Sequence, residues 1–70
     1  MEGTGIICRV VAARGFGFIQ QDNGGDDLFF HATQLADDLA FDEQLLERRV
    51  RFDTIESDKG QRAVDVRAAE

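Results

Sequence analysis

The chain has 70 residues, a formal net charge of −6 and an apolar fraction of 43%. A chain this short can build one small hydrophobic core, so we expect a single domain over residues 1–70 without a deep cleft between lobes. Its single cysteine, Cys8, excludes an intramolecular disulfide, and Cys8 and His31 lack the paired spacing of a zinc site. We therefore expect no structural metal, no cofactor and no small-molecule substrate.

The sequence holds no apolar run near the roughly 20 residues that span a bilayer, and its N-terminus lacks a basic stretch followed by a hydrophobic block. We therefore expect no membrane contact and a cytoplasmic location. The excess of acidic residues argues at first sight against a polyanion, because phosphates attract Lys and Arg. Several acids fall in stretches that we expect to be loops, namely Asp37, Asp38, Asp42, Glu43 and Asp58. The field at another face can therefore differ from the net charge.

The first two predicted strands lie between residues 6 and 20. Residues 6–11 are rich in β-branched side chains, which favours a strand over a helix. In residues 16–20 the side chains alternate, so that Phe16 and Phe18 lie on one face and Gly17 and Ile19 on the other. A glycine at position 17 lets another backbone approach closely, as at a barrel corner.

A tight turn and a third strand follow. Residues 22–26 read Asp-Asn-Gly-Gly-Asp, and the Asn-Gly and Gly-Gly pairs supply the positive φ angles of short hairpin loops. In the next strand, residues 27–31, Leu28 and Phe30 share one face, and Phe29 and His31 share the opposite one.

The pattern changes in residues 32–48, where leucines and alanines stand among polar residues in a composition more helical than extended. We predict a long connection that carries one or two short helical turns. Asp42 is the expected cap of a turn over residues 43–47, because its carboxylate can accept hydrogen bonds from the free amides of a helix start.

Alternation returns in residues 50–56 and in residues 62–67, with a turn over residues 57–60 between them. These two strands bring the predicted number to five. Five short strands in so few residues cannot bury both faces of a flat sheet. We therefore predict an all-β fold in which five antiparallel strands close into a small barrel.

The alternation in the two hairpin strands gathers four side chains on one face, Phe16, Phe18, Phe29 and His31. An arbitrary phenylalanine is more often part of the core than exposed. Burying these four would instead expose Ile19, Leu28 and Phe30, which is unfavourable because apolar surface is driven out of water. We therefore expect the rings to face solvent, where a base can stack on each at about 1 to 3 kcal/mol regardless of its identity.

Three segments carry a resemblance to a known family. Thr4-Gly5-Ile6-Ile7 resembles the opening strand of bacterial cold-shock proteins. Residues 14–19, Arg-Gly-Phe-Gly-Phe-Ile, resemble the first ribonucleoprotein motif of that family, and residues 28–31, Leu-Phe-Phe-His, resemble the second. The likeness covers residues 4–33 closely and residues 49–66 loosely, and this pair of motifs at this separation is specific.

The resemblance implies a Greek-key barrel of the oligonucleotide-binding fold that coats single-stranded RNA or DNA and can keep RNA unpaired. We expect no enzymatic activity, since no pair of titratable groups has plausible acid–base or metal-binding geometry in so small a fold. By this resemblance Phe16, Phe18, Phe29 and His31 would stack bases, and Arg14 would lie near phosphates. We expect a monomer rather than a homodimer.

The chain departs from the family at three stacking positions. Arg9 and Val10 stand where members usually carry Trp-Phe, and Ala32 stands where they carry a Phe after the His. At about 1 kcal/mol each, these losses would weaken binding by roughly a hundredfold or more unless Arg9 stacks its guanidinium or pairs with a phosphate. The connection also differs, and either Leu39 or Phe41 could take the place of a further base-contacting aromatic, with Phe41 expected mainly in the core.

Several alternatives compete with nucleic-acid binding. The depleted stacking surface, the acidic composition and the extra residues at Leu45-Leu46 suggest a barrel that serves as a protein-interaction or dimerisation module. A hydrolytic role for His31 has no suitably placed nucleophile. Arg9 could lower the pKa of Cys8, although we expect an unreactive thiol in a strand rather than a redox switch. Arg49 and Arg51 should face outward together, either as a phosphate track or paired with Asp42, Glu43 and Glu47.

Overall fold

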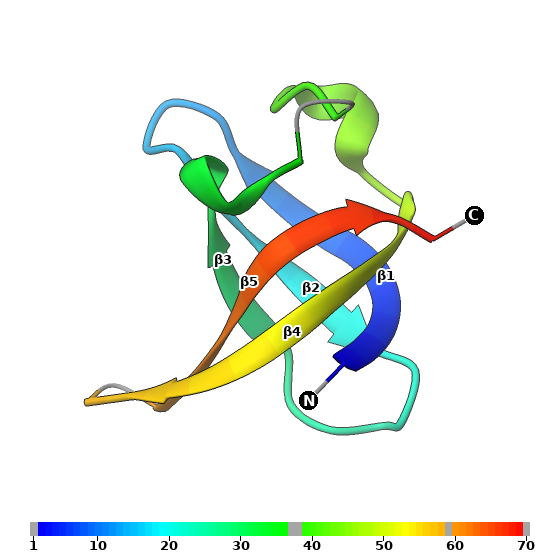
Figure 1. The fold of residues 1–70 in the computed structure, drawn as a ribbon. Helices are drawn as coiled ribbons and strands as arrows, with labels where there is room; N and C mark the ends of the chain where they lie inside the picture. The colour runs from blue at the N-terminus through cyan, green and yellow to red at the C-terminus, as the bar shows by residue number, and fades with distance from the viewer. Residues whose placement is uncertain (1, 37–38, 59, 70) are drawn as a thin grey trace.

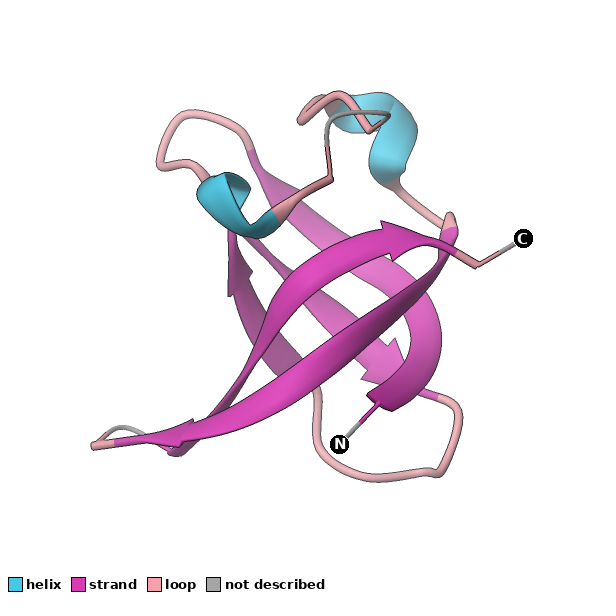
Figure 2. Ribbon diagram, in the orientation of Figure 1, coloured by secondary structure: helices cyan, strands magenta, loops and turns pink. Residues whose placement is uncertain are grey.

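The computed structural model describes residues 2–36, 39–58 and 60–69 of the chain (Figure 1). Within these residues the chain forms five strands and two short 3-10 helices. In chain order they are β1 (Glu2–Val11), β2 (Phe16–Gln21), β3 (Leu28–His31), η1 (Ala32–Gln34), η2 (Glu43–Leu45), β4 (Arg49–Ser57) and β5 (Gly60–Ala68). The strands close into a barrel in the order β1-β2-β3-β5-β4, and both helices lie in the connection above one end (Figure 2). The predicted all-β barrel is confirmed.

The pairing of the strands is antiparallel between β1 and β2, β1 and β4, β2 and β3, and β4 and β5. The contact between β3 and β5 is parallel and has one Cα pair among the described residues, Phe29 with Arg62. In this contact the barrel departs from the fully antiparallel prediction. The physical reason is that the long connection and β4 bring the chain back beside β3 in the same direction, as a parallel pair requires.

Strand β1 begins at Glu2, four residues before the predicted start. The first part of the strand contains Gly3 and Gly5, and glycines do not indicate a strand in the sequence. A Cβ atom on Gly3 would lie 2.9 Å from the Phe52 ring, and one on Gly5 would lie 2.4 Å from the Gln20 carbonyl oxygen. Glycine is unfavourable in a strand by propensity, yet here it allows the close approach that closes the barrel.

The core contains one side of each strand and two leucines of the connection. Its buried residues are Ile7, Ile19, Leu28, Phe30, Leu39, Leu45, Val50, Phe52, Ala63 and Val66. The Phe30 ring lies across Gly17, where a Cβ atom would meet the ring at 2.8 Å and the Arg9 carbonyl oxygen at 2.5 Å. Phe41 packs against the same core with its ring centroid 6.3 Å from that of Phe30, as expected.

The connection between β3 and β4 carries short helical turns, as predicted. Asp42 caps η2, since its Oδ1 accepts a hydrogen bond from the Gln44 amide at 2.9 Å. The turn is a short 3-10 helix that ends at Leu45 rather than extending to Glu47, because Glu47 adopts a left-handed conformation with φ of 67°. The predicted loop residues Asp37 and Asp38, and Lys59 of the β4–β5 turn, lie outside the described residues. No helix among the described residues is long and apolar enough to cross a membrane.

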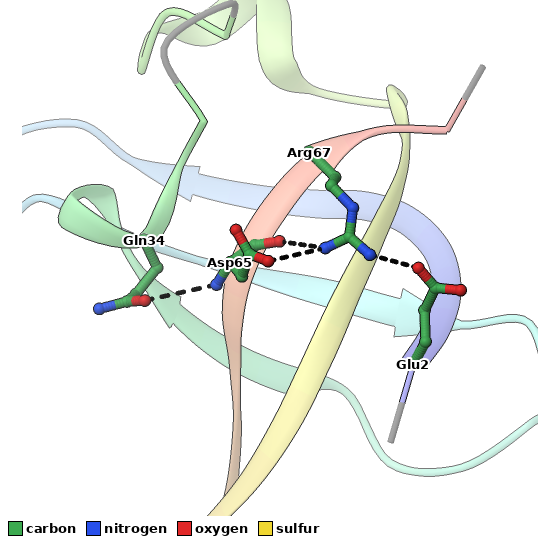
Figure 3. A network of polar contacts seen from close by, with 4 residues as sticks. All are labelled: Glu2, Gln34, Asp65 and Arg67. Atoms are coloured by element: carbon green, nitrogen blue, oxygen red, sulfur yellow. Dashed lines mark hydrogen bonds and ion pairs between the residues drawn. The ribbon is translucent and has the colours of Figure 1, made fainter.

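A polar network joins the start of β1, η1 and β5 (Figure 3). Arg67 donates to the Asp65 carbonyl oxygen at 2.8 Å and to its carboxylate at 3.1 Å, and it also pairs with Glu2. The Asp65 amide, turned outward by a φ of 54° at an irregular step of the β4–β5 ladder, donates to Gln34 Oε1 at 3.3 Å. The network therefore fixes the side chain of Gln34 beside β5.

Candidate nucleic-acid interface

The β2–β3 register brings the four predicted side chains together on the outer face of the hairpin. Phe16 lies opposite His31 and Phe18 lies opposite Phe29, and directly opposed residues share a face. We call these four residues the aromatic platform. His31 is exposed and the three rings are partly exposed, whereas Ile19, Leu28 and Phe30 are buried at 2% exposure or less. The predicted orientation of the rings is confirmed.

The three phenylalanine rings of the platform contact one another. The ring centroids of Phe16 and Phe29 are 5.3 Å apart at an interplanar angle of 34°. Phe18 meets Phe16 at 5.9 Å and Phe29 at 6.1 Å, both in edge-to-face geometry. Such contacts are favourable for aromatic pairs and hold the rings in fixed orientations while part of each ring stays accessible.

His31 is oriented by its neighbour on η1. Its Nδ1 accepts a hydrogen bond from the Thr33 amide at 3.2 Å and lies 3.0 Å from Thr33 Oγ1. In the neutral ring Nδ1 is therefore the acceptor, and Nε2 carries the hydrogen. Nε2 lies on the side of Gly15, where an added Cβ atom would stand 3.9 Å away. The imidazole thus offers a flat ring and one hydrogen-bond donor.

A β-bulge in β1 sets which of its side chains join the platform. Ile7 pairs with Ile19 and Arg9 pairs with Phe18, so Cys8 is the extra residue between them. Without it, alternation from the buried Ile7 would turn Arg9 inward and Val10 outward. With it, Arg9 is exposed on the face of Phe18, and Val10 packs against the core opposite Gly17. Of the two residues that replace the family's Trp-Phe pair, Arg9 can therefore reach a ligand on the platform.

The basic residues around the platform come from three segments. Arg9 lies on β1, Arg14 is exposed in the loop before β2, and Arg62 lies on β5. Within the described residues none of the three forms an ion pair, whereas Arg49 pairs with Asp22 at 2.7 Å and Arg67 pairs with Asp65 and Glu2. The platform is thus bordered by cations whose charge no carboxylate in the described chain neutralises directly.

Arg62 was not among the predicted site residues, and Arg49 has a partner, Asp22, that the sequence did not indicate. The Arg62 Cζ atom lies over the Phe29 ring, 5.5 Å from its centroid. Alternation in its strand indicated that Arg62 faces outward. It did not indicate the contact with Phe29, because that residue is distant in sequence and meets Arg62 only where β3 lies beside β5. Arg49 is exposed as predicted but pairs with Asp22, since β1 lies between β2 and β4 and brings their ends together.

The thiol of Cys8 is less acidic than an ordinary thiol. Its Sγ atom lies 3.6 Å from the Phe18 carbonyl oxygen and 3.7 Å from Asp27 Oδ2. Cys8 is exposed as a residue, but partial desolvation of its sulfur, and then the negative charge and hydrogen bond of Asp27, raise the pKa of the thiol. The suggestion that Arg9 lowers this pKa is therefore wrong, because the bulge places the thiol beside a carboxylate. In the described residues no three His, Cys, Asp or Glu side chains lie together as metal ligands would.

Comparison with known proteins agrees with this geometry. A family model described as the 'Cold-shock' DNA-binding domain matches residues 3–69. The chain is 38% identical over 63 residues to the cold shock-like protein CspG of Shewanella violacea, covering 90% of this chain and 89% of that protein. It is 37% identical over 65 residues to the cold shock-like protein CspA of Vibrio cholerae, covering 93% and 91%.

A solved structure shares the fold. The drosophila Unr CSD456 structure superposes with a TM-score of 0.80 at 22% sequence identity, and the match covers all of this chain and 27% of the other. The fold, the outward rings and the matched family model lead to one assignment. The chain belongs to the cold-shock DNA-binding domain family, whose members bind single-stranded nucleic acids rather than acting as enzymes.

Proposed function

We propose that this chain binds single-stranded RNA or DNA by stacking unpaired bases on the aromatic platform. The observation that carries the proposal is the partial exposure of three mutually contacting rings beside an exposed imidazole on one sheet face. A base stacked on such a ring contributes about 1 to 3 kcal/mol, and no base is excluded because each has a flat π-face. His31 can add a hydrogen bond from Nε2.

The bordering cations provide the phosphate contacts in this proposal. Arg9 and Arg14 flank the rings without an ion pair among the described residues, so each can neutralise a phosphate on the bound strand. The local field can therefore favour a polyanion although the chain as a whole carries −6. Binding by phosphate contacts displaces counterions, so the affinity should fall as salt concentration rises.

We further propose that the chain acts as an RNA chaperone in the cytoplasm. Arg9, Val10 and Ala32 replace three stacking surfaces of the family, and binding should be correspondingly modest. A protein that holds unpaired bases weakly and leaves quickly can keep RNA single-stranded without trapping it. Strand melting of a labelled RNA hairpin, with and without the protein, tests this activity directly.

The platform itself is tested by titrating an oligopyrimidine against the wild-type chain and against Phe18→Ala. Losing one stacking ring should weaken binding by roughly fivefold to a hundredfold. Leu46→Ala is the matched control, because Leu46 is apolar and 43% exposed but lies in the connection before β4. Equal affinities of wild type and Phe18→Ala would refute the platform.

The alternative, a protein-interaction or dimerisation module, receives less support. It rested in part on Leu45-Leu46, yet Leu45 is 3% exposed and belongs to the core, which leaves Leu46 as the exposed member of the pair. Scattered single apolar residues on a surface are normal. Light scattering separates the two ideas, since we expect a monomer and a stable dimer would favour the alternative.

A further inference from the structure

A row of three side chains runs from the platform onto the neighbouring strands. Phe29 on β3 pairs with Arg62 on β5, and Arg62 pairs with Ile55 on β4. Paired residues in adjacent strands share a face, so all three lie on the outside of the barrel. Ile55 is 46% exposed, and the Arg62 guanidinium carbon lies 5.5 Å from the centre of the Phe29 ring. The exposed face of the platform thus continues past β3.

Arg62 stands between two hollows in this surface. One has a volume of about 310 Å³ and is lined by His31, Thr33, Gln34, Arg62, Ala63 and Val64. The other has a volume of about 270 Å³ and is lined by Phe29, Ser57, Gln61 and Arg62. The first hollow borders the platform directly, because His31 belongs to both.

Gln34 supplies a fixed polar group to the first hollow. Its Oε1 accepts a hydrogen bond from the Asp65 amide at 3.3 Å, and its amide nitrogen points away from Asp65 (Figure 3). This hydrogen bond decides which end of the side-chain amide is left for a ligand. The available end is a donor, and bases offer carbonyl oxygens and ring nitrogens as acceptors.

Building on the proposed function, we infer that Arg62 extends the base-binding face onto β5. Its guanidinium lies over the Phe29 ring, and a base in the first hollow stacks on the guanidinium. Gln34 donates to a carbonyl oxygen of that base. The subsite therefore takes a base that turns a hydrogen-bond acceptor, such as a thymine or uracil carbonyl oxygen, toward Gln34.

The chemistry of the side chain explains why this position needs arginine. A guanidinium is flat and can stack on two sides at once, whereas the ammonium of lysine cannot. Its cation–π contact with Phe29 favours this position of the side chain in the free protein, so less conformational freedom is lost when a base binds. A simple phosphate contact would need only the positive charge.

The test measures binding of oligothymidylates from about four to about nine nucleotides, within the range of site sizes of such barrels, to wild type, Arg62→Lys and Arg62→Ala. We expect wild type to gain roughly tenfold in affinity when the strand becomes long enough to reach β5, and both variants to lose that gain. Arg51→Ala is the matched control. Arg51 is exposed, lies opposite Thr4 of β1 and Arg67 of β5 in the strand register, and is not part of the row. Thermal unfolding verifies that each variant is folded.

A second variant isolates the hydrogen bond from Gln34. Gln34→Ala should lose part of the gain that long oligothymidylates bring and should bind short ones as wild type does. In wild type the amide signals of Gln34 and Val64 should shift with long strands only. If Arg62→Lys matches wild type at every length, Arg62 is only a phosphate contact and the inference is wrong. If Phe18→Ala binds short strands as wild type does, the proposed function of the aromatic platform is wrong, whatever result the Arg62 variants give. Absence of binding at all lengths contradicts both proposals.

Discussion

The two faces of the β2–β3 hairpin use the same residue type for opposite purposes. Phe30 on the inner face is fully buried across Gly17, while its neighbour Phe29 lies on the outer face in contact with Phe16 and Phe18. Both are phenylalanines in a strand of four residues. The comparison teaches that the phase of a side chain in its strand, rather than its hydrophobicity, decides whether it stabilises the fold or remains available to a ligand.

Charged residues on the outside follow a similar division. Arg49 and Arg67 are held by Asp22, Asp65 and Glu2 around the β1–β4 side of the barrel. The arginines beside the aromatic platform have no such partner among the described residues. The net charge of −6 therefore gives little information about the field that a strand of nucleic acid meets.

Removing each ring in turn distinguishes the two faces of the hairpin most clearly. Phe30→Ala should lower the free energy of unfolding by about 3 to 5 kcal/mol, because it leaves a cavity in the core. Phe29→Ala should cost much less stability, about 1 kcal/mol, but should weaken oligonucleotide binding. Urea unfolding and a binding titration measure the two effects. Similar stability losses in both variants would contradict the assignment of faces.

The inner face can also be overfilled. Gly17→Ala places a Cβ atom 2.5 Å from the Arg9 carbonyl oxygen and 2.8 Å from the Phe30 ring, so one of them must move. We expect a loss of about 2 to 3 kcal/mol, measured by urea unfolding. Gly24→Ala is the control for added bulk, since nothing lies within 4 Å of its Cβ position, although its φ of 82° adds some strain. A larger loss at Gly24 than at Gly17 would contradict the packing argument.

The outer face can be strengthened by restoring a ring. Arg9→Trp should raise the affinity for a single strand about fivefold to tenfold, because the bulge presents position 9 beside Phe18. The dependence on salt should become weaker at the same time, since one cation is lost. Arg51→Trp, on the exposed surface of β4, should bring no such gain. Fluorescence titration at two salt concentrations measures both effects.

A smaller effect concerns the turn before β4. Glu47→Gly should raise the free energy of unfolding by about 1 kcal/mol, because a φ of 67° is strained for glutamate and unstrained for glycine. Asp65→Gly is the comparison, since Asp65 also has a positive φ but is held by Arg67 and tolerates this conformation better. Chemical unfolding should show a gain for Glu47→Gly only.

The smallest predicted effect is a pH dependence at Cys8. Because its pKa is raised in the folded chain, the thiolate forms at higher pH than in the unfolded chain. Alkylation should therefore be slower in the folded protein than in denaturant near the ordinary thiol pKa. Below that pKa both states keep the proton and stability is unaffected, and above it the unfolded chain releases its proton first and folding becomes less favourable. Asp27→Asn should reduce the difference, and equal alkylation rates would argue against the raised pKa.

Much of the fold follows from local patterns in the sequence. Alternation in β2, β3, β4 and β5 and the Asn-Gly-Gly turn predicted the strands, and they also predicted the outward set Phe16, Phe18, Phe29 and His31. Features that depend on contacts between distant segments were not predictable in this way. The parallel contact of β3 with β5, the ion pair of Arg49 with Asp22 and the position of Arg62 over Phe29 all need the strand order.

The bulge at Cys8 also bears on how β1 can change its length. In a regular strand, deleting one residue moves every following side chain to the opposite surface. At the bulge, loss of Cys8 would restore ordinary pairing and leave Ile7 inside, Arg9 outside and Val10 inside. Cys8 is therefore a position in the first strand that could be deleted in evolution, with the core residues still facing inward and Arg9 still facing the ligand.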